Sequence, residues 1–146
     1  MKPVVNQIEA HPFLQQPAHL DWCKQQDILV TAYSPTGNNI YGCPRALDDP
    51  EVVAVAKEAG KQPAQVLIQW AVQRGTAVLP KSVTPSRIAE NFEDFELSQA
   101  LMDRITALET NTRYNAPKKL GVDVFGELGA EVVKQARAEW IAQQKK

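Results

Sequence analysis

The sequence predicts an α/β protein with a parallel sheet. Strand-like apolar runs alternate with helical segments along the 146 residues. The run "ILVTAY" (28–33) is continuously apolar, as expected for a strand that is covered on both faces. With 44% hydrophobic residues, the chain has enough apolar material for a sizeable core.

Three segments are predicted to be strands. The first, "VVNQIE" (4–9), is rich in β-branched residues and ends at Ala10-His11-Pro12. The second is the 28–33 run, which Ser34-Pro35 terminates, and the third is the short segment "TAVLP" (76–80).

Helices are predicted between and after these strands, from apolar periodicity and from their end signals. Asp49 is expected to cap one helix and Gly60 to stop it, whereas Ser98 and the Thr84 hydroxyl are expected to cap two others. The predicted helices cover residues 18–26, 50–59, 63–74, a segment that begins at 85, 98–109 and 130–146.

The remaining segments are predicted to be loops, at 34–49 and over most of 110–129. Three parallel strands would leave two unpaired edges, and we expect Val30 and Leu79 to lack the facing strands that should cover them. The chain is therefore expected to be part of a larger fold and to fold poorly alone.

Composition narrows the function classes. The formal net charge is -1, which argues against a general nucleic-acid or anionic-membrane binder. No apolar run reaches transmembrane length, and the N-terminus lacks a signal-peptide pattern. Cys23 and Cys43 have no CxxC spacing and fit a reducing compartment, so we expect a cytoplasmic protein.

The segment "VLPKSVTPSRIAEN" (78–91) places two cations around a helix start, where the helix dipole disfavours them. Lys81 and Ser82 follow a strand, and Arg87, Glu90 and Asn91 share one helical face. Cations beside free amides suit a phosphate monoester, and Glu90 with Asn91 could meet an adenine edge. A solvated polar face with an ordinary Glu–Arg pair is the alternative that spacing leaves open.

Two polar or aromatic strand residues allow similar alternatives. Tyr33, at the end of its strand, could stack on a flat cofactor ring or belong to the core. Gln7 would need a partner if it is buried, which a ligand amide or a neighbouring strand could supply.

The histidines and adjacent aspartates do not indicate a metal or catalytic site. His11 and His19 are too isolated in sequence for a metal centre, and we assign them to loop polarity and to a helix surface. Asp48-Asp49 is more simply a helix cap than a catalytic carboxylate pair.

Four segments resemble successive signature blocks of the aldo-keto reductases: "VVNQIEAHPFLQQ", "VTAYSPTG", "PAQVLIQWAVQRG" and "VLPKSVTPSRIAENF". The resemblance runs in order from about Lys2 to Leu108, whereas residues 110–146 match only as loosely as a variable tail. It implies a (β/α)8 TIM barrel that binds NADPH at the C-terminal face of its strands. The chain would be the C-terminal portion of this NADP-dependent domain (1–146), with the last three strands, their helices and a tail helix.

The resemblance also assigns roles to residues, each by the motif in which it lies. It implies that Gln7 bonds the nicotinamide carboxamide and that Tyr33 stacks on its ring. Ser34 and Thr36 would lie in the loop over the pyrophosphate. The segment around the 2′-phosphate is matched by Lys81, Ser82, Val83 and Arg87, and the adenine contacts by Glu90 and Asn91.

This sequence departs from the family pattern in one respect, which limits the implied activity. The family's catalytic Asp, Tyr, Lys and His come from the first half of the barrel, and this chain begins at what resembles the sixth strand. Neither histidine and none of Tyr33, Tyr41 and Tyr114 lies in a catalytic motif, so no catalytic residue is assigned. Either the start is truncated at an internal methionine or the gene encodes a half-protein.

Two interpretations of the function remain open. In the first, this chain is the cofactor-binding portion of an oxidoreductase that reduces small aldehydes or ketones to alcohols, inactive when isolated and monomeric in its full-length form. In the second, it is a non-catalytic nucleotide-binding or barrel-complementing module.

Overall fold

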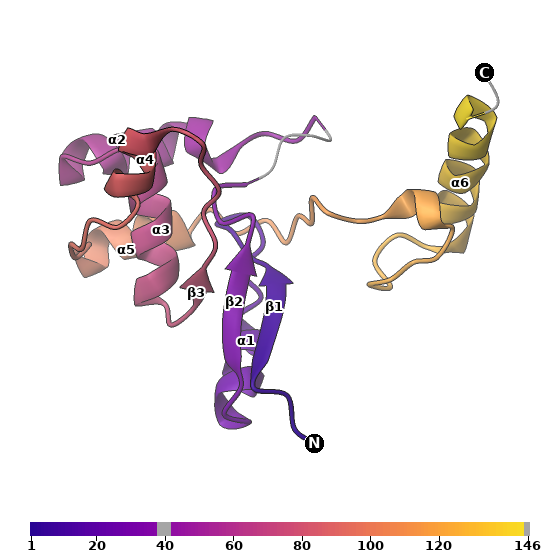
Figure 1. The fold of residues 1–146 in the computed structure, drawn as a ribbon, viewed down its shortest axis with the longest axis horizontal. Helices are drawn as coiled ribbons and strands as arrows, with labels where there is room; N and C mark the ends of the chain where they lie inside the picture. Colours follow the sequence, from indigo (N-terminus) through magenta and orange to yellow (C-terminus); the bar gives the residue numbers. More distant parts are fainter. Residues whose placement is uncertain (38–41, 145–146) are drawn as a thin grey trace. The chain divides into compact units, whose positions relative to one another are not determined.

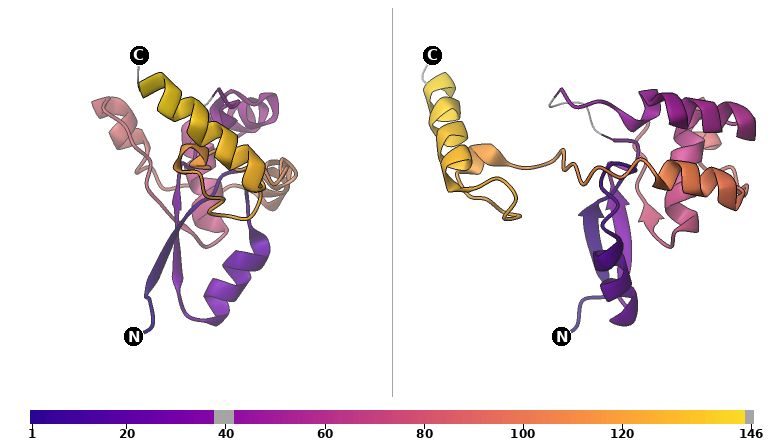
Figure 2. Two further views of the ribbon diagram at one scale, coloured as in Figure 1. Left: turned by 90° about the vertical axis from the view of Figure 1, so that its right-hand side faces the viewer. Right: turned by 180° about the vertical axis from the view of Figure 1, so that it is seen from behind.

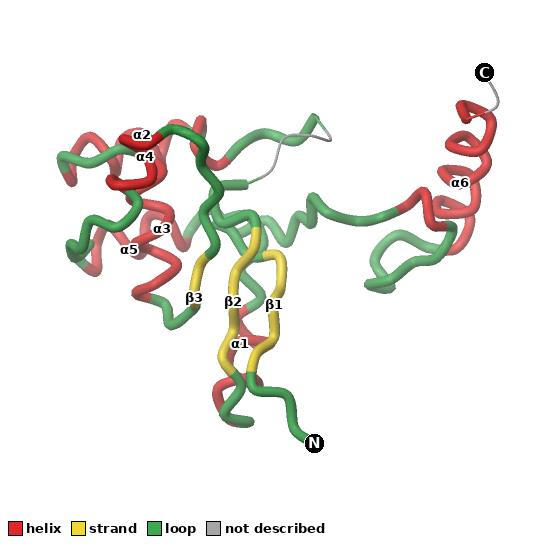
Figure 3. The backbone as a smooth tube through the Cα atoms, viewed as in Figure 1, coloured by secondary structure: helices red, strands yellow, loops and turns green. Residues whose placement is uncertain are grey.

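Three parallel strands form one sheet in the order β1-β2-β3 (Figure 1). The structure, a computed structural model, describes residues 1–37 and 42–144. The strands are β1 (Val5–Glu9), β2 (Leu29–Tyr33) and β3 (Ala77–Val78), and they lie side by side in Figure 3. The predicted α/β class with a parallel sheet is confirmed.

The strand β3 is shorter than predicted, for two local reasons. Thr76 is tied to the turn that follows the helix Pro63–Gln73, because its amide and its hydroxyl both donate to the Ala71 carbonyl, at 3.1 and 2.7 Å. Pro80 has no N–H to donate to a ladder. Because the strand order is β1-β2-β3, β1 and β3 are the two edges of the sheet within the described residues.

The helix α1 (Pro17–Gln25) covers one face of β1 and β2 (Figure 2). Because strand side chains alternate between faces, Ile8 and Val30 point toward this helix. They pack with Leu20, Cys23 and Ile28 in a small apolar cluster. The expectation that Val30 depends on facing strands for its cover was wrong, because it packs against α1 and is only 4% exposed, whereas Leu79 is 55% exposed.

The larger core lies among the helices α2 (Pro50–Ala59), α3 (Pro63–Gln73) and α5 (Gln99–Thr106). Trp70 is its largest fully buried side chain, and its indole N–H donates to Thr106 Oγ1 at 3.1 Å. The other buried members come from the same helices and the segments beside them: Ala46, Val52, Val55, Ala56, Val66, Leu67, Ala71, Leu97, Leu101 and Ile105.

Most predicted helix ends are confirmed, and one cap was wrong. Asp49 accepts from the amide of Glu51 at 2.8 Å, and Gly60 ends α2 with φ +65°. The hydroxyl of Ser98 accepts from the Leu101 amide at 3.4 Å.

The exception is α4 (Pro85–Glu90), whose cap position, Thr84, makes no capping bond through its side chain. The Thr84 amide instead donates to Ser82 Oγ at 3.2 Å, so the serine two residues upstream shapes this turn.

The predicted loops contain two short 3₁₀ turns, Ala46–Asp48 and Lys118–Leu120. Residues 38–41 of the first loop and 145–146 of the last predicted helix lie outside the described residues.

The chain divides into two compact units, Met1–Tyr114 and Asn115–Lys146. The second contains α6 (Ala130–Gln144) and a loop in which Asp123 accepts from the Leu128 and Gly129 amides, both at 2.8 Å. These bonds, from Gly129 first and then Leu128, hold the pKa of Asp123 below its usual value. Among the described helices, none combines the length and apolarity required to cross a membrane.

Candidate functional site

A cleft of about 870 Å³ lies within the first unit, beyond the C-terminal ends of β2 and β3. This is the side of a parallel sheet on which α/β folds place their ligand sites. The segments after the two strands, the turn Ala46–Asp48, the start of α3 and the helix α4 supply its walls. Its lining residues are Ser34–Gly37, Arg45, Leu47, Asp48, Gln62–Gln65, Ile68, Leu79–Ser82, Ser86, Arg87, Glu90 and Asn91.

Seven of the ten residues predicted from the sequence to contact a cofactor line this cleft. They are Ser34, Thr36, Lys81, Ser82, Arg87, Glu90 and Asn91. The structure brings together residues from two loops and one helix that are up to 57 positions apart, counted from Ser34 to Asn91. Gln7, Tyr33 and Val83 do not line it.

The cations of the cleft differ in their partners. Within the described part of the chain, neither Lys81 nor Arg87 forms an ion pair or a side-chain hydrogen bond, so the alternative of an ordinary Arg87–Glu90 pair has no support there. Both side chains are exposed, as they would also be on a solvated polar face. Arg45 instead pairs with Asp48, Nε to Oδ2 at 2.5 Å and Nη2 to Oδ1 at 2.7 Å. Lys81 and Arg87 are therefore the charges available to an anion.

The Arg45–Asp48 pair changes the pKa of both groups in the direction expected for an ion pair. Its hydrogen bond raises the pKa of Arg45 and lowers the pKa of Asp48. The two opposite charges of this wall are thus paired with each other.

The position of α4 depends on α3. Gln65 donates from Nε2 to the Glu90 carbonyl at 3.1 Å and to Glu93 Oε2 at 2.8 Å. Lys61 Nζ lies 2.7 Å from the same carboxylate oxygen, and its hydrogen bond is the main cause of the lowered pKa of Glu93. These contacts hold the end of α4, and with it Glu90 and Asn91, beside the helical core.

Sequence reasoning missed Gln62 and Gln65 as cleft residues. The local signal at this position marks the start of α3: the Gln62 amide donates to Gln65 Oε1 at 2.9 Å, which is one half of a capping box. This signal indicates a helix start and does not by itself indicate a cleft.

The loop after β2 enters the cleft through an uncommon backbone conformation. Ser34 has φ +54°, in the left-handed region that few residues other than glycine adopt. Its carbonyl accepts from the Gly37 amide at 2.9 Å, which closes a tight turn. Such conformations persist where surrounding structure holds them and often mark ligand sites.

The three predicted residues outside the cleft have different surroundings. Gln7 is exposed, so it needs no buried partner, and Val83 is 78% exposed. Gln7 and Thr31 are register partners, and alternation places Tyr33 on the same face of the sheet, opposite α1. Burial, and secondarily the Glu9 carboxylate, raises the pKa of Tyr33.

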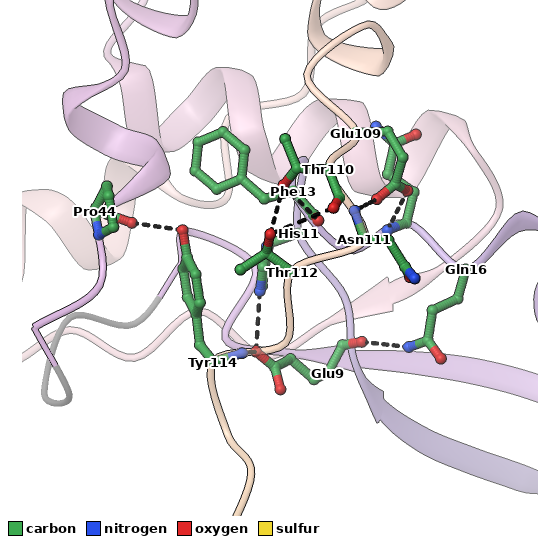
Figure 4. A network of polar contacts seen from close by, with 11 residues as sticks. Glu9, His11, Phe13, Gln16, Pro44, Glu109, Thr110, Asn111, Thr112 and Tyr114 are labelled. Carbon is green, nitrogen blue, oxygen red and sulfur yellow. Dashed lines mark hydrogen bonds and ion pairs between the residues drawn. The ribbon is translucent and has the colours of Figure 1, made fainter. Parts of the chain in front are cut away.

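A buried polar network lies at the end of β1 (Figure 4). Glu9 and His11 have fully buried side chains, with His11 Nε2 3.0 Å from Glu9 Oε1. The Tyr114 amide donates to the same oxygen at 2.8 Å, and the Tyr114 ring stacks on the imidazole with centroids 4.7 Å apart. The assignment of His11 to loop polarity was wrong, because the distant Tyr114 helps to bury it.

His19 lies on α1, where Asn6 Nδ2 approaches its Nε2 at 2.9 Å, so it contacts β1 and is not simply a surface residue. The described residues contain no group of histidine, cysteine and carboxylate side chains that could hold a metal ion.

Comparison with known proteins identifies the family. Residues 1–110 match the model of the Aldo/keto reductase family. The chain is 47% identical over 123 residues to Aldo-keto reductase family 1 member A1-A of Danio rerio, a match that covers 80% of this chain and 38% of that protein.

It is also 43% identical over 128 residues to the NADPH-dependent D-xylose reductase of Meyerozyma guilliermondii, with 80% of this chain and 40% of that protein covered. The chain thus spans about two fifths of the length of these relatives. Because the family model matches most of its residues, the chain belongs to the aldo-keto reductase family.

Proposed function

We propose that this chain supplies the NADPH-binding part of an aldo-keto reductase, and that the complete protein reduces small aldehydes or ketones to alcohols. The observation that carries the proposal is the cleft, which gathers Lys81 and Arg87 without acidic partners among the described residues. Membership of the family and the name of the NADPH-dependent relative support the same conclusion.

The residues of the cleft fit a phosphorylated dinucleotide. Two cations without partners in the described chain suit a phosphate monoester, which NADPH carries on its ribose and NADH lacks. The hydroxyls of Ser34, Thr36 and Ser82 are available to phosphate oxygens, and Glu90 with Asn91 offers an acceptor and a donor for adenine. The cleft volume of about 870 Å³ lies in the range of small-molecule sites.

Three further residues complete the proposed site. Gln7 and Tyr33 share the face of the sheet opposite α1, where Gln7 would bond the nicotinamide carboxamide and Tyr33 would stack on its ring. Val83 would contact the dinucleotide through its backbone beside Ser82. The nicotinamide, when bound, supplies the hydride that reduces the carbonyl carbon.

We propose that the fold is the last three strands of a (β/α)8 barrel, with residues 110–146 as a variable tail. The chain covers about 38–40% of its relatives, and both sheet edges in the described chain are open. The catalytic Asp, Tyr, Lys and His would then lie in the other part of the barrel. This chain alone would bind cofactor without a positioned proton donor, and we propose a cytoplasmic, monomeric complete enzyme.

A titration tests cofactor binding directly. We expect the complete protein that contains this chain to bind NADPH more tightly than NADH, measured by the fluorescence of the reduced nicotinamide. Arg87→Ala should weaken NADPH about ten- to a hundredfold and NADH much less, because a charge-assisted phosphate contact is worth about 1.5–3 kcal/mol. Lys57→Ala, an exposed lysine on α2, is the control and should change neither constant. Equal losses for both cofactors would show that Arg87 does not read the 2′-phosphate.

An activity assay separates the two interpretations. If the chain is the cofactor-binding part of an enzyme, mixing it with NADPH and a reactive aldehyde should give no oxidation above background, and activity should require the complete barrel. Turnover by this chain alone would contradict the absence of catalytic groups. A complete protein that binds NADPH without reducing any carbonyl would favour the non-catalytic module.

A further inference from the structure

The network around Glu9 and His11 connects two segments that are far apart in the sequence. The first segment is the end of β1, with Glu9 as its last residue and His11 just after it. The second segment contains Tyr114, whose amide donates to Glu9 Oε1 and whose ring stacks on His11 (Figure 4). The Thr112 amide adds a bond to the Phe13 carbonyl at 2.8 Å. Tyr114 is only 6% exposed, so its ring has a fixed place at the end of the sheet.

The same ring reaches the loop that lines the cleft, at two points. Its hydroxyl donates to the Pro44 carbonyl at 2.8 Å, directly before Arg45. On the other side, Gly37 lies close to the ring and to Ala46: a Cβ at this position would be 3.6 Å from Cε2 of Tyr114 and 2.8 Å from the Ala46 nitrogen. Tyr114 therefore lies against both Gly37 and Pro44, although it does not line the cleft itself.

The bond to Pro44 bears on the wall of the cleft because the next residues of the chain form that wall. Arg45, Leu47 and Asp48 line the cleft, and they belong to a short turn in which the Asp48 amide donates to the Arg45 carbonyl at 3.1 Å. Ala46, within this turn, is fully buried in the helical core. The turn is thus fixed from one side by the core and from the other by the Tyr114 hydroxyl.

We propose that Tyr114 is a positioning residue for dinucleotide binding: through its hydroxyl and the Pro44 carbonyl it sets the wall formed by Arg45, Leu47 and Asp48. The proposal rests on the proposed function, because it takes the ligand of the cleft to be NADPH. It adds a residue beyond the matched family segment, since that segment ends at residue 110. The Glu9–His11 pair serves as the support that holds the ring in place.

The first measurement is the dissociation constant for NADPH in the Tyr114→Phe variant. Phenylalanine keeps the ring, its stacking on His11 and the amide bond to Glu9, so only the hydroxyl bond is lost. We expect binding to weaken about two- to tenfold, as for the loss of one neutral hydrogen bond. Thr112→Val removes an exposed hydroxyl from the same segment and should leave the constant unchanged. Thermal melting of each variant verifies that the comparison is made on folded protein.

The second measurement follows the loop without any ligand. Amide hydrogen exchange of Asp48 and Asp49 should be faster in Tyr114→Phe by a factor of about two to ten, whereas exchange in α5 should not change. A variant that only lost general stability would show the same relative acceleration in both places.

The two measurements distinguish the possible failures. If the parent chain does not bind NADPH but exchange at Asp48 and Asp49 still responds, the proposed function fails while the contact through Pro44 stands. If the parent binds and Tyr114→Phe changes neither the constant nor the exchange, the positioning role is overturned. If Tyr114→Phe accelerates the amide exchange of Asp48 and Asp49 but leaves the dissociation constant for NADPH unchanged, Tyr114 holds the wall without any effect on binding, which also overturns the proposal.

Discussion

The helices α2, α3 and α5 bury a continuous apolar core, whereas the strands of the sheet bury one face more completely than the other. On the helical side, Val52, Val55, Leu67 and Ile105 are fully buried around Trp70. On the sheet side, the cluster against α1 has three buried members among the residues that the structure describes, and several apolar side chains near or on the strands are about half exposed or more. These are Val4, Val5, Leu29 and Leu79.

This difference indicates which region is more completely packed. The helical region buries a continuous core, against which Phe13 and Val78 from outside the three helices also pack. The sheet leaves apolar residues and two strand edges uncovered within the described chain, as a sheet does when it continues into further strands. The cleft lies between the two regions, with Lys81 after a strand and Gln65 on a helix of the core.

The largest effect is expected in the helical core. Trp70→Ala should lower the free energy of unfolding by about 3–5 kcal/mol, because it removes a buried ring and leaves a cavity. The variant also loses the indole bond to Thr106 and the stacking of Arg74 on the ring. Urea denaturation followed by circular dichroism measures the change. Trp22, 52% exposed on α1, is the matched control, and Trp22→Ala should cost less than about 0.5–1 kcal/mol.

A matched pair of valines sharpens the comparison. Val55 is fully buried in the helical core, and Val30 is 4% exposed in the cluster of the sheet. We expect Val55→Ala to cost about 1.5–3 kcal/mol and Val30→Ala about 1 kcal/mol, because the smaller cluster can close around the lost methyl groups. Equal losses in the same denaturation experiment would show that the two regions are equally well packed.

A substitution on the sheet face opposite α1 tests why Val5 is exposed there. Val5 is 49% exposed, so Val5→Ala should change the stability of this chain by no more than about 0.5 kcal/mol. If the sheet continues into a complete barrel, the same substitution in the complete protein should cost about 1–2 kcal/mol, because the side chain is then covered. Equally small changes in both proteins would contradict the proposed barrel.

The smallest effect concerns the ion pair between Lys61, just before α3, and Glu93, just after α4. Lys61 lowers the pKa of Glu93, so the ionised carboxylate contributes stability above its unfolded pKa of about 4.3. That contribution is lost as the pH falls from about 4.3 through the lower folded pKa. Glu93→Gln should therefore reduce the acid dependence of the melting temperature below about pH 4.3. An unchanged profile would mean that the Lys61–Glu93 pair does not form in solution.

The sequence by itself determined the elements and much of the cleft. Asp49-Pro50, Gln62-Pro63 and Ser98 mark helix starts through local chemistry that needs no distant partner. Lys81, Arg87, Glu90 and Asn91 lie within one short segment, so a strand end and a helix face bring them together without information from the rest of the chain.

Only the tertiary structure decided which of these groups are paired or buried. Periodicity predicts the face on which a side chain lies, but not the element that packs against it. Val30 is covered by α1, and His11 is buried by Tyr114, 103 positions away, counted from residue 11 to residue 114. Lys81 and Arg87 have no acidic partner in the described chain, and this depends on where the backbone places the acidic side chains, because charge pairing acts only over a few ångströms.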